Sequence, residues 1–170
     1  MQIESKCYPV AVLGAGTMGE GIAQIAATSG HPVMLYDVSQ AQTQGAIENI
    51  AKRLERSVNK EKITDEKRTQ ILANISPARA LGELAQVKLA IEAIIEDLGI
   101  KQDVFSQLES LLEADAILAT NTSSIDLNKM GSKLKHPQRL VGMHFFNPAQ
   151  VMALVEIVHS NETDSEVADL

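Results

Sequence analysis

The sequence contains little cysteine, few aromatic residues and no excess of positive charge. Cys7 is its single cysteine, which excludes a disulfide within the chain and a cysteine-based metal cluster. Tryptophan is absent, and the aromatics are two tyrosines and three phenylalanines. Aliphatic side chains must therefore fill the core, as is typical of parallel sheets covered by helices. The formal net charge of −7 disfavours nucleic acid and anionic membrane surfaces as partners.

Long apolar runs are missing too. No stretch is long enough for a transmembrane helix, and the N-terminus lacks the pattern of a signal peptide. Together with the single cysteine, this favours a cytoplasmic protein without a membrane partner. The 170 residues, of which 45% are hydrophobic, suit one domain with a sizeable core.

The most informative stretch is the glycine-rich turn at residues 14–19. It follows a short apolar run that predicts a buried strand, and it precedes a helix expected over residues 18–29. Gly14 allows a sharp turn, Gly16 lets the backbone approach a pyrophosphate, and Gly19 lets the helix pack closely on the strand. In this context the motif favours a dinucleotide site over a plain structural turn. Its candidate cofactor-binding residues are Gly14, Ala15, Gly16, Thr17, Met18 and Gly19.

An acidic residue follows the second expected strand, residues 33–36. Asp37 lies at about the interval from Gly14 expected of the carboxylate that binds the adenosine ribose. No arginine follows at once to hold a 2′-phosphate, so NAD is favoured over NADP. The alternative explanation for Asp37 is a solvated strand end or a helix cap.

Two consecutive helices are expected next, over residues 39–59 and after Thr64. They interrupt the alternation of strands and helices as an inserted hairpin, which could form one wall of a substrate cleft. Its basic side would suit a phosphorylated ligand, although a solvated charged face is the favoured explanation from sequence alone. That side carries Lys52, Arg53, Arg56, Lys60 and Lys62.

The remaining pattern predicts a doubly wound α/β domain with a mostly parallel sheet. Further strands are expected at residues 75–76, 87–93, 116–120 and 140–146, an extended segment at 151–158, and a helix at 100–112. Glu96 and Asp97 fall in a strand-to-helix loop, where such sheets bind ligands. The hydroxyl-rich residues 121–124 end another strand, and we expect at least one of their serines to cap the helix that follows.

Two polar residues stand in the last apolar strands. A lone histidine such as His144 is most often a core residue, whereas a carboxylate such as Glu156 is rarely buried without a partner, at a cost on the order of several kcal/mol. Together they explain each other. An imidazole bonded to Glu156 through one nitrogen keeps the other free to act as a base. Beside a nicotinamide, this pair indicates alcohol oxidation or ketone reduction, and we expect the two side chains within about 4 Å.

These blocks together resemble a known family. They are G-A-G-T-M-G at 14–19, E-A at 92–93 with E-D at 96–97 and Lys101, N-T-S-S at 121–124, H-F-F-N-P at 144–148, and V-M and L-V-E at 151–152 and 154–156. From about Tyr8 onward the chain is similar to the NAD-binding domain of the L-3-hydroxyacyl-CoA dehydrogenases. The H-F-F-N-P block is the most specific. The resemblance implies a Rossmann-type sheet over residues 1–170, with the helical hairpin inserted after the second strand.

The resemblance also implies residue roles. His144 would be the general base, Glu156 would orient it and stabilise its protonated form, and Ser123 would bind the substrate oxygen near the nicotinamide. Asp37 would bind the adenosine ribose; Glu96, Lys101 and Asn147 would line the nicotinamide side; Arg53 and Lys60 would approach the CoA phosphates, Lys60 being the better match. No metal is expected, and His31, His136 and His159 are given no role.

Family members continue into a helical domain that closes the cleft, dimerises and supplies a further asparagine. The resemblance therefore implies NAD binding without competent turnover by these 170 residues, and a homodimer for a full-length protein. The substrate would be an L-3-hydroxyacyl-CoA of fatty-acid or phenylacetate-type catabolism, with the 3-hydroxybutyryl-CoA and 3-hydroxyadipyl-CoA branches both open. A non-catalytic NAD-binding structural or sensing module is the alternative.

Overall fold

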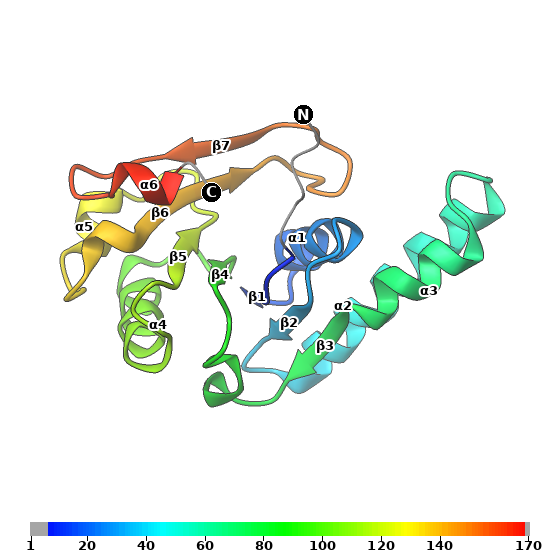
Figure 1. Cartoon of the computed structure of the whole chain (residues 1–170), viewed down its shortest axis with the longest axis horizontal. Helices are drawn as coiled ribbons and strands as arrows, with labels where there is room; N and C mark the ends of the chain where they lie inside the picture. Colours follow the sequence, from blue (N-terminus) through cyan, green and yellow to red (C-terminus); the bar gives the residue numbers. More distant parts are fainter. Residues whose placement is uncertain (1–6, 169–170) are drawn as a thin grey trace.

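A computed structural model describes residues 7–168, so the outermost ends of the expected domain, 1–6 and 169–170, lie outside the described residues. One seven-stranded sheet has the order β3-β2-β1-β4-β5-β6-β7. All neighbouring strands are parallel except β6 and β7. Helices cover both faces of the sheet (Figure 1). This confirms the predicted doubly wound, Rossmann-type fold.

The element bounds follow the expected pattern closely. The strands are β1 (Val10–Leu13), β2 (Val33–Tyr36), β3 (Ile75–Ala78), β4 (Leu89–Glu92), β5 (Ile117–Thr120), β6 (Leu140–Phe145) and β7 (Val155–Val158). The helices are α1 (Thr17–Thr28), α2 (Gln40–Asn59), α3 (Asp65–Ala73), α4 (Leu98–Leu111), α5 (Leu127–Gly131) and α6 (Ser165–Ala168), with 3-10 turns at Leu81–Leu84 and Pro137–Arg139.

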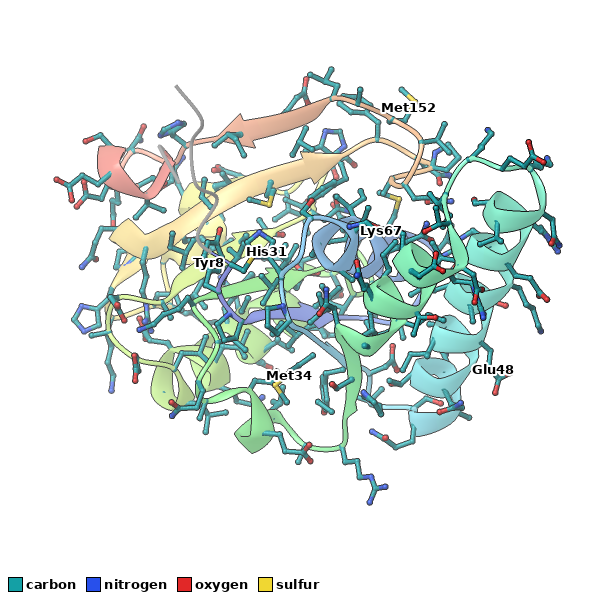
Figure 2. The ribbon with its side chains drawn as sticks, turned by 45° about the vertical axis from the view of Figure 1, so that its right-hand side comes forward. Tyr8, His31, Met34, Glu48, Lys67 and Met152 are labelled. Carbon is teal, nitrogen blue, oxygen red and sulfur yellow. The ribbon has the colours of Figure 1, made fainter. Side chains whose placement is uncertain are left out.

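The last extended segment is shorter than expected. Residues 151–154 are not part of a strand, because the amides of Val151 and Met152 both donate to the carbonyl of Pro148 and turn the chain there. Only Val155–Val158 pairs with β6. The side chain of Met152 lies on the connection between the two strands (Figure 2), where it is exposed.

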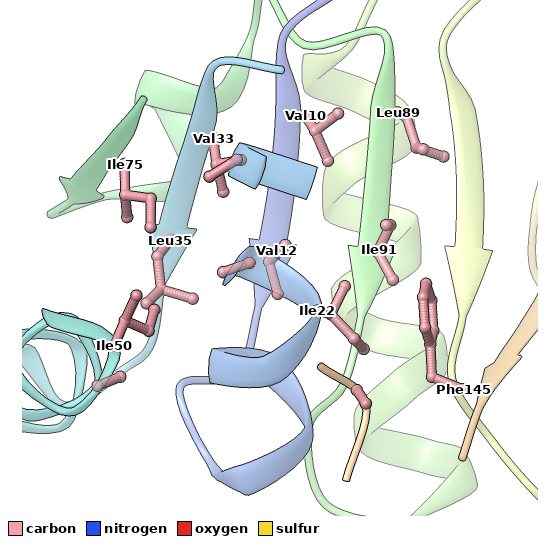
Figure 3. Close-up of a cluster of buried hydrophobic side chains, with 14 of the residues drawn as sticks. Val10, Val12, Ile22, Val33, Leu35, Ile50, Ile75, Leu89, Ile91 and Phe145 are labelled. Carbon is pink, nitrogen blue, oxygen red and sulfur yellow. The ribbon is translucent and has the colours of Figure 1, made fainter. Parts of the chain in front are cut away.

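The central strands are buried on both faces. Along β1, Val10 and Val12 pack with one apolar cluster, which lies under α1 and α2, while Ala11 and Leu13 pack with a second cluster under α4 and α5. Figure 3 shows the first cluster, in which Ile22 of α1 lies over the sheet. Burial on both faces explains why these strands are continuous apolar runs rather than alternating ones.

The inserted hairpin is held against α1. Ile50 and Leu54 of α2 and Ile71 of α3 are buried in the first cluster. Its polar contacts also reach α1: Arg53 forms an ion pair with Glu20 and donates to Gln24 Oε1 at 2.9 Å. The rest of the hairpin projects from the sheet edge (Figure 1). The insertion is therefore a packed part of the domain.

Tyr8, near the start of the described chain, contacts His31, which follows the end of α1. The rings of Tyr8 and His31 meet edge-on with centroids 4.6 Å apart (Figure 2), and His31 Nδ1 lies 3.1 Å from the Tyr8 carbonyl oxygen. His31 thus has a structural contact that its position in a turn did not predict. Within residues 7–168, none of the helices has the length and apolar character needed to cross a membrane.

The contact between α1 and the glycine-rich turn gives a stability prediction. A methyl group at Gly19 would lie 1.7 Å from the carbonyl oxygen of Gly14. Because backbone must then move, Gly19→Ala should lower the free energy of unfolding by about 3 kcal/mol, measured by urea denaturation. Gly45→Ala in α2 is the matched control, since its methyl group would meet nothing within 4 Å. The Gly45→Ala variant should be about 1 kcal/mol more stable than the wild type. Equal stability of the two variants would contradict the packing argument.

Candidate active site

Two glycines of the turn between β1 and α1 have the roles that the motif predicts. Gly14 has a φ of +99°, and a Cβ there would lie 2.5 Å from the carbonyl oxygen of Ala93. Gly19 brings α1 against the carbonyl of Gly14. At Gly16, by contrast, an added Cβ would meet nothing within 4 Å. The open space at Gly16 has room for a ligand close to the backbone.

The N-terminus of α1 differs from those of the other longer helices. Ser39, Thr64 and Asp97 cap α2, α3 and α4 with their side chains, each accepting a hydrogen bond from a first-turn amide. Gly16 caps α1 without any side-chain hydrogen bond. The first amides of α1 therefore keep their donors for a ligand, and a phosphate is the group that such a helix end binds best.

A groove of about 620 Å³ runs past this helix end. Its walls are formed by the glycine-rich turn, the end of β2 and the loop after β4: Leu13, Gly14, Gly16, Thr17, Met18, Tyr36, Asp37, Val38, Gln42, Ala93, Ile94, Ile95, Ile100 and Val104. Val38 is 91% exposed at its edge. An apolar groove beside a phosphate-binding helix end fits a nucleotide.

Asp37 lines this groove and connects the glycine-rich turn to the start of α2. One carboxylate oxygen accepts the amide of Ala15 and the other accepts the amide of Ser39, both at 2.9 Å. The helix-cap alternative is wrong, because Ser39 caps α2 and Asp37 only accepts the amide of that cap residue. The same two bonds fix its carboxylate next to the glycine-rich turn.

His144 and Glu156 are direct partners across β6 and β7. His144 Nδ1 lies 2.8 Å from Glu156 Oε2, which confirms the expected contact. The pair is more exposed than the apolar sequence around it suggests: the side chain of Glu156 is 52% exposed and that of His144 22%. The reason is strand order, because β7 is the edge strand and all four of its residues are exposed.

The hydroxyl-rich loop after β5 faces this pair. A pocket of about 180 Å³ is lined by Thr122, Ser123, Ser124, Ile125, Leu127, Gly142, His144, Glu156 and Val158. Ser123 thus lines the same pocket as the histidine. The expected capping role of a serine is wrong: Asp126 caps α5 by accepting from the amide of Asn128. Thr122 Oγ1 instead accepts from the amide of Ile125 at 3.0 Å in the turn before the helix.

An ion-pair network lies between the groove and this pocket; Glu92 and Lys101 are its buried members, and the Glu96 side chain is 42% exposed. Lys101, 1% exposed, has its Nζ 2.6 Å from Glu92 Oε1 and 3.1 Å from Glu96 Oε2. Glu96 in turn accepts hydrogen bonds from the hydroxyls of Thr122 and Ser124. The sequence analysis gave roles to Lys101 and Glu96 and named Glu92 only within the family pattern, without a role; Glu92 is 0% exposed. The available signal was a glutamate ending the apolar strand Leu89–Glu92.

The other expected site residues lie elsewhere. Asn147 is exposed two residues after the end of β6. Lys60 is exposed where α2 ends, whereas Arg53 is half-buried and already paired with Glu20. Neither hairpin residue lines the groove or the pocket. Throughout residues 7–168, no three side chains of His, Cys, Asp or Glu gather as a metal site requires.

This geometry agrees with comparisons to known proteins. A family model described as "3-hydroxyacyl-CoA dehydrogenase, NAD binding domain" matches residues 9–170. The chain belongs to this family. The cofactor of this family is NAD.

Relatives with names and structures extend this dehydrogenase assignment. A 3-hydroxyadipyl-CoA dehydrogenase of Escherichia coli is 43% identical over 160 residues, which are 94% of this chain and 34% of that protein. A 3-hydroxybutyryl-CoA dehydrogenase of Mycobacterium tuberculosis is 39% identical over 94% of this chain and 56% of its own length. A crystal structure of the (S)-3-hydroxybutyryl-CoA dehydrogenase of Ralstonia eutropha superposes with a TM-score of 0.93 at 36% identity, covering 96% of this chain and 58% of that one. The chain therefore spans between a third and three fifths of these relatives.

Gly16 offers a test of the phosphate cradle. Gly16→Ala should leave the Tm unchanged, because its methyl group meets no atom and the residue's φ of −76° suits alanine. It should weaken NAD binding about tenfold, measured by calorimetry, because the methyl group occupies the space beside the helix end. Unchanged NAD affinity in a folded variant would show that the pyrophosphate lies elsewhere.

Glu96 gives a prediction about pH. Burial opposes ionisation of its carboxyl, but hydrogen bonds from Thr122 and Lys101 outweigh burial, so its pKa is below the ordinary 4.5. A lowered pKa means that the ionised group stabilises the fold above pH 4.5 and that this contribution is lost as the pH falls through the folded-state pKa. The difference in unfolding free energy between wild type and Glu96→Gln should therefore be constant near neutrality and shrink in acid.

The control for this titration is Glu55→Gln, at an exposed position of α2. Its difference from wild type should stay small throughout, measured by urea denaturation at each pH. A Glu96→Gln difference that grows in acid would contradict the assigned direction.

Proposed function

We propose that this domain takes part in NAD-dependent oxidation of the 3-hydroxyl of an L-3-hydroxyacyl-CoA to the 3-oxoacyl-CoA. The observation that carries this proposal is the 2.8 Å contact between His144 and Glu156 in the same pocket as Ser123. Family membership supplies the cofactor, and this pair supplies a proton acceptor beside a hydrogen-bonding hydroxyl.

The contact between the two side chains supports a role for each. Nδ1 of His144 is held by the carboxylate of Glu156, so Nε2 is the nitrogen that accepts the proton of the substrate hydroxyl. Glu156 then stabilises the imidazolium by its negative charge. NAD supplies the acceptor for the hydride that leaves C3 as the carbon–oxygen bond becomes a carbonyl. The reverse reduction uses the imidazolium as the proton donor.

Further contacts of the substrate and cofactor are taken from the roles that the family resemblance implies. Ser123 would donate a hydrogen bond to the substrate oxygen, and Glu96, Lys101 and Asn147 would line the nicotinamide side. Lys60 is the better candidate for the CoA phosphates, because Arg53 already pairs with Glu20. The acyl group is that of a 3-hydroxyadipyl-CoA or a 3-hydroxybutyryl-CoA, the substrates in the names of the relatives above.

These 170 residues should bind NAD and turn over slowly. Glu156 is half exposed, and the apolar side chains of β7, Val155, Ile157 and Val158, face solvent. Water therefore reaches the reacting groups, which weakens the electrostatic interactions that support proton transfer. The homodimer implied by the family is proposed for the complete protein, where mass measurement in solution would test it.

Replacing the histidine tests the proposed chemistry. In the protein as its gene encodes it, His144→Ala should lower kcat on acetoacetyl-CoA and NADH by about 100-fold or more, because proton transfer loses its donor. NAD affinity should be unchanged, since His144 does not line the NAD groove.

The matched control is His159→Ala, at an exposed position just after β7. It should have wild-type kcat. NAD binding without turnover in the unmodified full-length protein would instead favour the structural or sensing module.

A further inference from the structure

Glu92 is a fully buried carboxylate with no part in the proposed proton transfer. Its Oε1 accepts from the amide of Ile94 at 2.8 Å and from Lys101 Nζ at 2.6 Å. Its Oε2 accepts from the hydroxyl of Thr120 at 2.7 Å. These three bonds join β4, β5 and α4 at a single side chain.

Its position is where the two halves of the sheet diverge. The chain goes from β1 to β2 on one side and returns to β4 on the other, so the crevice for a dinucleotide opens between β1 and β4. Glu92 is in register with Leu13, the last residue before the glycine-rich turn, and with Thr120 of β5. Ala93 and Ile94, which follow it, line the NAD groove. Glu92 therefore lies under the floor of the crevice, beside the half that does not hold the adenosine.

Two chains of contacts lead from Glu92 to the reacting groups. The first passes through Lys101 to Glu96, which binds the hydroxyls of Thr122 and Ser124 on either side of Ser123. The second starts at the Glu92 backbone carbonyl, which accepts the amide of Asn121 at 2.8 Å.

The second chain then reaches β6. The side-chain oxygen of Asn121 accepts the amide of Phe145 at 2.9 Å, and Phe145 is the neighbour of His144. The loop that carries Ser123 and the strand that carries His144 are thus tied to the same residue.

The charge balance argues against a purely structural role. Two carboxylates, Glu92 and Glu96, share the one ammonium of Lys101, so the network keeps a net negative charge; Glu92 and Lys101 are fully buried, and the Glu96 side chain is 42% exposed. Apolar side chains would fill a strand end at least as stably as a buried ion pair. This network loses solvation free energy and holds the loop of residues 121–124 in place. A role in positioning that loop explains it better.

We propose that Glu92 is a positioning residue for the nicotinamide half of the NAD site, acting through Lys101 on Glu96 and the loop of residues 121–124. This rests on the proposed function in one respect, the placement of the nicotinamide at this end of the crevice. It does not depend on proton transfer at His144.

The test compares two ligands by calorimetry. ADP-ribose occupies the adenosine and pyrophosphate part of the groove and lacks the nicotinamide. Glu92→Gln keeps the size of the side chain and removes its charge, so it should weaken NAD binding about tenfold, as expected for losing a charged hydrogen bond. ADP-ribose should bind as it does to the wild type. Equal losses for both ligands, or no loss for either, would overturn the proposal.

A double-mutant cycle tests whether Glu92 acts through Lys101. Lys101→Met should also weaken NAD selectively, and the double variant should bind NAD no worse than Lys101→Met alone. Losses that add would mean that Glu92 acts independently of Lys101 and would overturn the proposal.

Thr120→Val provides a variant that keeps both charges and removes the hydroxyl that donates to Glu92 Oε2 and accepts the amide of Thr122 at 3.3 Å. It should weaken NAD less than Glu92→Gln does and leave ADP-ribose unchanged, so the proposal stays falsifiable if Glu92→Gln fails to fold. A Thr120→Val variant with unchanged NAD affinity would then count against it. If His144 proves not to be the catalytic base, these binding results are unaffected. If the wild type binds neither NAD nor ADP-ribose, the groove is not the NAD site.

Discussion

The close approach of α1 to the glycine-rich turn is the constraint on which the rest of the site depends. Gly19 leaves no room between the helix and the carbonyl of Gly14, and Gly14 leaves none between the turn and Ala93. These two contacts fix the direction in which α1 points, and so the direction of its unsatisfied amides. Sheet, turn and helix end therefore form one rigid unit, and the groove beside it exists before any ligand arrives.

The same unit explains how a chain with a net charge of −7 holds an anionic cofactor. In the proposed site, backbone amides and a helix dipole attract the pyrophosphate over a few ångströms, a range on which surface carboxylates have little effect. The long-range charge disfavours polyanions, whereas the local donors favour one small phosphate group. The inserted hairpin also has few positive charges free for an anion. Arg53 is paired with Glu20, and exposed groups such as Lys60 remain at the tip of the hairpin.

Much of the domain was predictable because its signals are local. The bounds of β2, the inserted hairpin, the glycine-rich turn and the pairing of His144 with Glu156 follow from residue patterns and from the need of polar groups for partners. Glu92 was missed because its partner lies on α4, whose path over the sheet no local pattern encodes. The exposure of Glu156 depends on which strand ends at the sheet edge. The cap of α5 was misplaced because several neighbouring oxygens compete, and backbone geometry selected Asp126.

The antiparallel pairing of β7 with β6 has a consequence for how the domain can vary. Side chains alternate across a strand, and His144 meets Glu156 only because the connection between the strands has its present length. Lengthening or shortening that connection by one residue would turn Glu156 to the opposite face and bring Val155 or Ile157 opposite the histidine. A change of two residues would keep the face and shift the partner. The length of the loop of residues 146–154 thus sets the register between β6 and β7. That length decides, as much as the identity of either side chain, whether His144 and Glu156 are paired.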